Sequence, residues 1–171
     1  EMDVIRAVFR PFEHAYWSVQ PRHVLQELTA DQVATWKKDD WWEDGGKWSR
    51  LHYHNWTIEE EYFKTEWEAC FQGIMQCNYI MDDLTTLDCE SLGMTQEKFD
   101  ALASQCRTLR AWFYLRLLDE FRNVPLAVSS DVTKNTDTNV SPQTLFDFIE
   151  SELLECLDLL PVKSGAAGNG L

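Results

Sequence analysis

Apolar residues recur at helical spacing in three long segments of the chain. The first segment follows Thr57, which forms with Glu60 the Thr-x-x-Glu pattern of a helix start. Apolar side chains then return every three, four or seven residues, which predicts one amphipathic helix over about residues 58–84. Its apolar positions are Phe63, Trp67, Phe71, Ile74, Met81 and Leu84.

Two further segments carry the same signal with clear boundaries. Thr95 is suited to cap the second helix, whose apolar stripe runs from Phe99 to Phe121. Ser141 and Pro142 predict the start of the third helix, because proline favours the first helical position, and Pro161 ends it. The apolar positions of this third helix are Leu145, Ile149, Leu153, Cys156 and Leu160.

The remaining segments are less regular. Residues 1–19 predict a fourth helix, weakened by Pro11 because an interior proline removes a helical hydrogen bond. Residues 122–128 predict an extended strap, since Pro125 biases the preceding residue away from helix. Residues 20–56 predict an irregular stretch. The pattern therefore indicates an all-α fold of tetratricopeptide-like antiparallel helix pairs with long irregular loops, without a fixed sequence repeat.

The irregular stretch carries an unusual set of aromatic residues. Within residues 39–56, Trp41, Trp42, Trp48 and Trp56 stand among Gly, Asp and Lys. A Gly-Gly pair permits a tight turn, and loops on a rigid scaffold are where binding residues concentrate. An indole face suits the apolar C–H face of a sugar ring, while charged and amide groups suit its hydroxyls. The alternative is that these rings fold back and seal the helix ends.

The other candidate functional residues give only weak signals. His52 and His54 would share one side of an extended strand, but no third metal ligand stands nearby, so a structural pair is expected. Five cysteines include no Cys-x-x-Cys pair, and we expect buried free thiols. Trp67 and Trp112 are expected in the core. No nucleophile, nucleotide or metalloenzyme motif occurs, so we expect no catalytic residue, no metal and no cofactor.

Composition narrows the function classes. The net charge of −14 would repel phosphate backbones, which argues against nucleic acid as a partner. Aromatic residues reach 13% with eight Trp, so either the core is unusually aromatic or some rings have a function at the surface. No apolar run approaches the roughly 20 residues of a membrane-spanning helix. The chain opens at Glu1 and closes on a small-residue segment, and we expect further sequence at both ends.

Residues 105–126 resemble the signature helix and strap of the SusD/RagB family. Gln105, Thr108 and Arg122 depart from the family pattern. Segments beginning at Trp67 and Ser141 resemble two further motifs of the family in the same order, so the resemblance covers about residues 57–161. The positions of the signature that match are Arg107, Leu109, Arg110, Ala111, Tyr114, Leu117, Phe121, Val124, Pro125 and Leu126.

The resemblance implies a non-enzymatic, surface-exposed lipoprotein of the outer membrane, with residues 1–171 as the N-terminal part of a helical domain. It implies an oligosaccharide or polysaccharide ligand, a SusC-like TonB-dependent transporter as partner, and a lipidated cysteine outside this chain. An N-terminal loop comparable to residues 31–56 contributes ligand contacts in the family. A protein-interaction scaffold and an all-helical glycosidase remain as alternatives. The candidate ligand residues are Trp41, Trp42, Trp48, Trp56, Arg50, Asn55 and Asp31.

Overall fold

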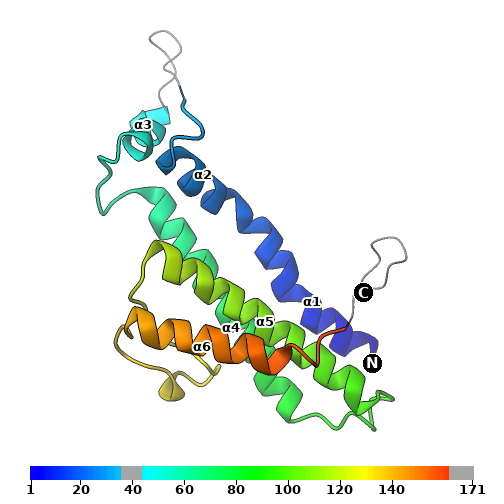
Figure 1. The fold of residues 1–171 in the computed structure, drawn as a ribbon. Helices are drawn as coiled ribbons and strands as arrows, with labels where there is room; N and C mark the ends of the chain where they lie inside the picture. Colours follow the sequence, from blue (N-terminus) through cyan, green and yellow to red (C-terminus); the bar gives the residue numbers. More distant parts are fainter. Residues whose placement is uncertain (36–43, 162–171) are drawn as a thin grey trace. The chain divides into compact units, whose positions relative to one another are not determined.

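The computed structural model describes residues 1–35 and 44–161, and its regular structure is helical (Figure 1). Within these ranges no β-strand forms, and the strand-like contact is an isolated antiparallel bridge between Pro125 and Asn139. The predicted all-α fold is confirmed. The α-helices are α1 (Met2–Trp17), α2 (Val19–Thr29), α3 (Lys47–His52), α4 (Glu61–Thr85), α5 (Gln96–Glu120) and α6 (Pro142–Cys156).

The three long predicted helices are α4, α5 and α6. The Thr95 Oγ1 accepts a hydrogen bond from the backbone N–H of Lys98, and the Ser141 Oγ accepts one from that of Thr144, as their capping positions predict. The predicted start of α4 is wrong, because the helix begins at Glu61. The carboxylate of Glu60, expected to cap the helix, instead binds a distant arginine, and the capping box does not form.

Of the two predictions for the N-terminal part of the chain, the helix is correct and the irregular stretch after it is not. Helix α1 forms as expected and runs through Pro11, which is buried. The irregular stretch predicted over residues 20–56 is wrong in two places, because residues 19–29 form α2 and residues 47–52 form α3. Pro21 lies in the first turn of α2, where the missing N–H costs no helical bond, and Leu25 and Leu28 supply a buried face.

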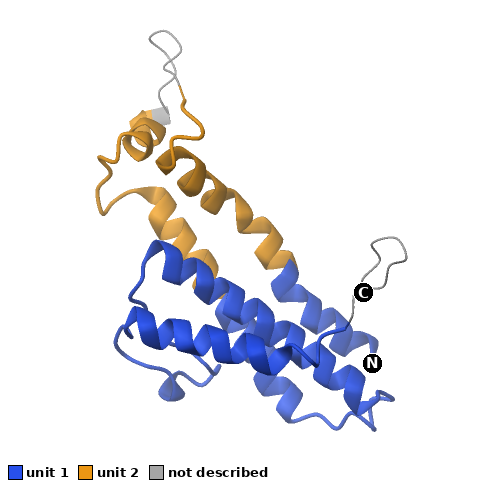
Figure 2. Cartoon of the chain, in the orientation of Figure 1, with its two compact units in different colours: residues 1–12, 73–171 blue, residues 13–72 orange. Residues whose placement is uncertain are grey.

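The chain divides into two compact units (Figure 2). Unit 1 comprises residues 1–12 and 73–171, and unit 2 comprises residues 13–72. Helices α1 and α4 contribute residues to both units. In the part of unit 2 that is described, Leu25, Leu28 and Leu51 form a small core.

Unit 1 contains the larger core. Its buried residues come from the start of α1, the end of α4, the following loop and α5, and α5 packs against the antiparallel α6 (Figure 1). A Cβ at Gly73 would lie 2.2 Å from Cζ of Phe113, so only glycine lets this ring lie against α4.

Trp67 and Trp112, expected in the core, are half-buried beside Phe71 and Phe113 respectively.

The cysteines follow their predicted state with one exception. All five are free thiols, and four are buried, whereas Cys89 is half-buried and donates to Gln96. Burial raises the pKa of the Cys106 thiol to about 12 and also raises that of Cys77. The buried thiols therefore serve as small core residues.

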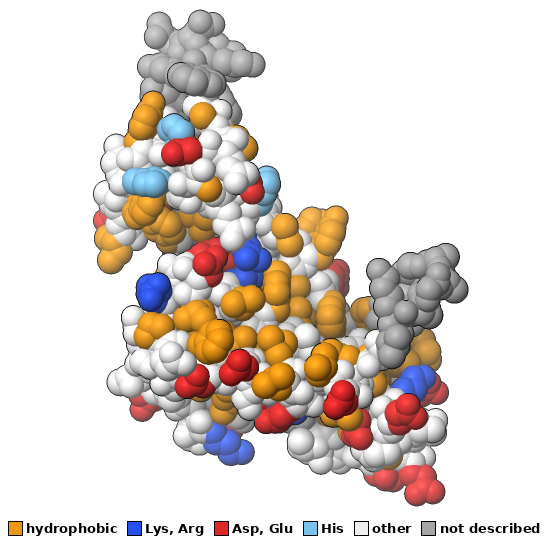
Figure 3. Space-filling model, in the orientation of Figure 1, with side chains coloured by type: hydrophobic (Ala, Val, Ile, Leu, Met, Phe, Trp, Pro, Cys, Tyr) orange, Lys and Arg blue, Asp and Glu red, His pale blue; other side chains and the backbone are white. Residues whose placement is uncertain are grey.

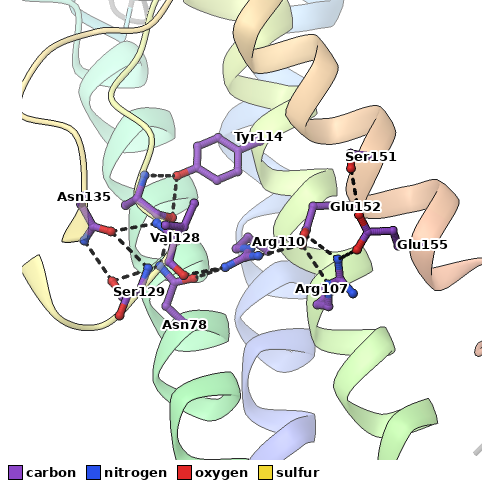
Figure 4. A network of polar contacts seen from close by, with 11 residues as sticks. Asn78, Arg107, Arg110, Tyr114, Val128, Ser129, Asn135, Ser151, Glu152 and Glu155 are labelled. Atoms are coloured by element: carbon purple, nitrogen blue, oxygen red, sulfur yellow. Dashed lines mark hydrogen bonds and ion pairs between the residues drawn. The ribbon is translucent and has the colours of Figure 1, made fainter. Parts of the chain in front are cut away.

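Arg110 joins three segments of unit 1 (Figure 4). Its Nη1 donates to Asn78 Oδ1 of α4 at 2.7 Å and to the carbonyl of Val128 at 3.0 Å. Its Nη2 donates to Glu152 Oε2 of α6 at 2.7 Å. The side chain is 7% exposed, so this charge is matched inside the protein by directed bonds.

Arg107 completes the cluster on the α6 side. Its Nη2 donates to Glu152 Oε1 at 2.8 Å and to Glu155 Oε2 at 2.6 Å. Burial alone would raise the pKa of Glu152, but the hydrogen bond from Arg107 and the charge of Arg110 outweigh it. The pKa of this carboxyl is therefore lower than usual, and Glu152 stays ionised at neutral pH.

The strap predicted over residues 122–128 is extended only after a bend at its start, where Arg122 has a φ of 64°, and it forms a bridge at Pro125. Side chains hold it in place. The Tyr114 hydroxyl donates to the carbonyl of Ala127 at 2.9 Å and accepts from its N–H at 2.7 Å. Asn78 Nδ2 donates to the same carbonyl at 3.0 Å. Burial of Tyr114 raises its pKa to about 12, which keeps the donating proton in place. The signature residues therefore act as structural residues.

Candidate functional site

The candidate ligand residues all belong to unit 2. Trp41 and Trp42 lie outside the described residues. The other five follow α2, lie on α3 or lie between α3 and α4: Asp31, Trp48, Arg50, Asn55 and Trp56.

A glycine pair sets the start of α3. Gly45 and Gly46 have φ values of 64° and 75°, in the left-handed region that glycine adopts at little cost. Arg50 Nη1 donates to the carbonyl of Gly45 at 2.8 Å, which ties this turn to the helix that follows. The tight turn predicted here is confirmed.

Arg50 holds a buried carboxylate. Its Nε and Nη2 donate to the two carboxylate oxygens of Glu60 at 2.8 and 3.3 Å, a bidentate pair. Glu60 is 3% exposed, so it needs this partner, whereas the side chain of Arg50 is 38% exposed. A ligand would reach Arg50 only at the part of its side chain that remains exposed.

Trp48 makes its main contacts within the protein. Its indole N–H donates to the Tyr62 hydroxyl at 3.1 Å, and its ring lies against the core formed by Leu25, Leu28 and Leu51. This position corresponds to the alternative in which a ring folds back onto the helices. The acceptor is a phenol hydroxyl from α4 and not a backbone carbonyl.

Trp56 and Tyr53 are more open to solvent. Trp56 is 38% exposed, and its ring meets Phe63 edge-on with centroids 5.6 Å apart. Tyr53 is 69% exposed and stands edge-on to His52 with centroids 4.9 Å apart. Sequence reasoning did not include Tyr53 among the ligand residues. Its signal was its position among the tryptophans at the end of a polar, aromatic segment.

The two polar candidates lie beside this exposed segment. Asn55 is exposed, and its backbone N–H donates to the carbonyl of Arg50 at 3.0 Å. The side chain of Asp31 is 72% exposed, with Oδ1 lying 3.4 Å from His52 Nδ1. Both side chains are therefore accessible to a hydroxyl-rich ligand.

The histidines have local structural partners. His52 ends α3, and His54 has a φ of 54°, so the predicted extended strand is wrong. The His54 Nε2–H donates to the carbonyl of Thr29 at 2.8 Å, which joins the loop after α3 to the end of α2. Among the described residues, no group of three or more His, Cys, Asp or Glu side chains is arranged to hold a metal ion.

Residues 53–58 thus present aromatic and polar side chains on a segment that is tied to neighbouring helices near its start. The backbone N–H of Asn55 binds α3, and the side chain of His54 binds the end of α2. Tyr53 and Trp56 offer ring surface to solvent, and Ile58 is 98% exposed. Exposed rings on a fixed backbone can stack on a sugar ring without a large loss of conformational freedom.

Residues 14–167 match the model of a SusD-like family described as starch-binding and associating with the outer membrane. No curated protein matches the chain. No helix in the described part of the chain has the length and apolar character of a membrane span.

Several solved structures have a similar fold. A laminarin-binding SusD-like protein has a TM-score of 0.74 at 20% identity, over 94% of this chain and 34% of its own. A SusD-like protein from Bacteroides fragilis has a TM-score of 0.79 at 17% identity, over 99% of this chain and 31% of its own. A structure with a xylogluco-oligosaccharide has a TM-score of 0.72 at 14% identity, over 94% of this chain and 30% of its own.

These similarities concern the fold. The chain spans about a third of the length of these proteins. The tetratricopeptide-like fold expected from the helix pairs is the fold that they share with it.

Proposed function

Because the chain belongs to the SusD-like family of starch-binding, outer-membrane-associated proteins, we propose that it binds oligosaccharides at the cell surface and delivers them to a TonB-dependent transporter. The observation that carries this proposal is the family match over residues 14–167, nearly the whole chain. Similar folds occur in a laminarin-binding protein and in a structure with a xylogluco-oligosaccharide, which supports a β-glucan or related glycan as ligand.

The proposed site is the exposed aromatic segment of unit 2. The faces of Trp56 and Tyr53 would stack on sugar rings, and Asn55 and Asp31 would bind hydroxyl groups. Trp41 and Trp42 stay in the proposed set as predictions from the sequence. Trp48 and Arg50 stay as well, but their contacts with Tyr62 and Glu60 favour a supporting role in which they hold the segment in place.

The proposed activity is capture without cleavage. The sequence offers no recognisable catalytic motif, and the family is described by binding. Attachment to the outer membrane would come from a lipidated cysteine outside this chain, as in the family that it resembles. The transporter would be a SusC-like protein, which co-purification of the full-length protein from its native membrane would identify.

The test measures glycan binding by the full-length protein. Laminarin, xyloglucan oligosaccharides and starch are compared by affinity gel electrophoresis and titration calorimetry, with the products analysed chromatographically. Trp56→Ala and Tyr53→Ala should each weaken binding roughly ten-fold, about 1.4 kcal/mol, while the helical circular dichroism is retained. The matched control is Tyr79→Ala, an aromatic residue of α4 in unit 1 that is 56% exposed, which should bind as the unchanged protein does.

Each outcome has a distinct meaning. Binding that survives both substitutions and also Trp41→Ala with Trp42→Ala would move the sugar site out of unit 2 while keeping the function. Absence of binding to every glycan would favour the protein-interaction scaffold. Cleaved products would overturn the non-enzymatic proposal.

A further inference from the structure

Helix α6 has a broad apolar surface, of which one part is buried and the adjoining part is exposed. The buried part packs against α5 and contains Leu145, Ile149 and Cys156. The adjoining part is exposed to solvent, and Figure 3 shows hydrophobic side chains gathered over this region of unit 1. This exposed part, called here the α6 stripe, has side chains that are 41–66% exposed: Phe146, Leu153, Leu154 and Leu157.

The spacing of the α6 stripe is that of one helix face. Leu153, Leu154 and Leu157 follow Phe146 by seven, eight and eleven residues, which brings all four to the same side of the helix. Leu157 continues this face because it keeps helical backbone angles, with φ −53° and ψ −47°. A third sector of α6 is polar and contains Asp147, Ser151 and Glu155.

A helix with this distribution is built for an interior position. In stacks of helix pairs, the terminal helix exposes a polar outer face, whereas inner helices are apolar towards both neighbours. Contiguous apolar surface on a soluble protein marks an interaction site. The polar sector of α6 is the part suited to solvent, so the α6 stripe requires a partner.

The length of the solved relatives identifies the kind of partner. This chain matches 34% and 31% of two SusD-like structures, so proteins with this fold carry about twice as much further polypeptide. We propose that the α6 stripe packs against a helix of the polypeptide that follows Pro161 in the full-length protein. That helix begins the next antiparallel pair and presents an apolar face to the four stripe residues.

Glu150 adds a specific requirement for the incoming helix. It lies four residues after Phe146 and four before Leu154, within the stripe, and it is exposed. A carboxylate in an apolar contact needs a charged partner or a place at its edge. The incoming helix should therefore place a Lys or Arg opposite Glu150. This proposal does not depend on sugar binding.

The first test measures side-chain accessibility in the full-length protein. In a Cys89→Ser background, Leu153→Cys probes the stripe and Ser151→Cys probes the polar sector of the same helix, since both side chains are exposed here and point to different sides of α6. Maleimide should react at least ten-fold more slowly with the stripe thiol than with the control thiol, and at equal rates once both are unfolded in urea. Phe146→Cys gives a second stripe position should Leu153→Cys lose its helical signal. Equal rates in the folded protein would overturn the proposal.

The second test identifies what covers the stripe. A photo-crosslinking benzoylphenylalanine at position 150 should capture a peptide C-terminal to residue 161 of the same molecule, at a yield unchanged by hundred-fold dilution. Capture of a peptide from another copy, with protection lost on dilution, would assign the stripe to a dimer and overturn the proposal. Capture within residues 1–161 would overturn it as well.

Discussion

Unit 1 and unit 2 use their polar side chains for different purposes. In unit 1, Arg110 directs its guanidinium to Asn78, Val128 and Glu152, all inside the protein. In unit 2, the side chains of Asp31 and Asn55 are exposed beside the rings of Tyr53 and Trp56. The residues that make the family recognisable therefore hold the fold, and they carry no information about the ligand. Specificity for a glycan would lie in the segment that has no fixed motif.

The largest expected effect tests the structural half of this comparison. Arg110→Met leaves the buried Glu152 and Asn78 without their central donor and should lower the free energy of unfolding by about 3–5 kcal/mol. Urea unfolding of the full-length protein measures it. Arg107→Met is the matched control and should cost less, because the side chain of Arg107 is 26% exposed and that of Arg110 is 7% exposed. A stable Arg110→Met protein that has lost glycan binding would break the comparison.

A second, smaller effect tests the close contact between α4 and α5. Gly73→Ala would force a methyl group into the ring of Phe113 and should cost roughly 1–3 kcal/mol. The double variant Gly73→Ala with Phe113→Leu should recover part of that loss, because leucine leaves room for the methyl group. Additive costs in the double variant, measured by urea unfolding, would show that the two sites are not coupled.

The pH dependence of stability tests the charge cluster. The pKa of Glu152 is lowered from 4.5 in the folded state, so its contribution is complete above pH 4.5 and is lost as the pH falls through the lower folded value. Glu152→Gln should make stability fall less steeply below pH 4.5, measured by urea unfolding at pH 7, 5, 4 and 3. Glu155 and Asp82, whose pKa values are also lowered, keep some acid sensitivity in the variant. Identical slopes would contradict a paired Glu152.

The smallest expected effect tests whether Trp48 of unit 2 contributes to stability or to ligand binding. Trp48→Phe removes the hydrogen bond to Tyr62 and should cost about 1 kcal/mol of stability while leaving glycan affinity unchanged. Calorimetric titration beside urea unfolding separates the two readouts. Lost affinity at unchanged stability would return Trp48 to the ligand-contacting residues.

The sequence predicted α5 and the start of α6 well because their periodicity and caps are local features. The end of α6 was predicted too late, because the helix stops at Cys156 and not just before Pro161. Helix α2 was missed because its two buried leucines follow Pro21 and polar residues, so its period is short and diluted. The start of α4 was misplaced because the partner of Glu60 lies ten residues upstream, on a helix that was not predicted. A local pattern in the sequence gives no information about such a tertiary contact.

The proposed site follows from the sequence as a region, whereas the surroundings of each of its residues do not. Trp48 and Trp56 have similar neighbours in sequence, all aromatic or polar. What separates them is the position of Tyr62 and Phe63 on α4, which take the N–H of one indole and the edge of the other. Tyr53 was overlooked because the pattern gave weight to tryptophan alone.

The burial of the cysteines has a consequence for how they react with oxidants. The thiolate is the form that reacts with oxidants and disulfides, and burial raises the pKa of Cys77 and Cys106. These sulfurs stay protonated and shielded, so they resist sulfenic acid formation and disulfide exchange without any bridge. Oxidative damage to the cysteines of this chain should therefore begin at the half-buried Cys89.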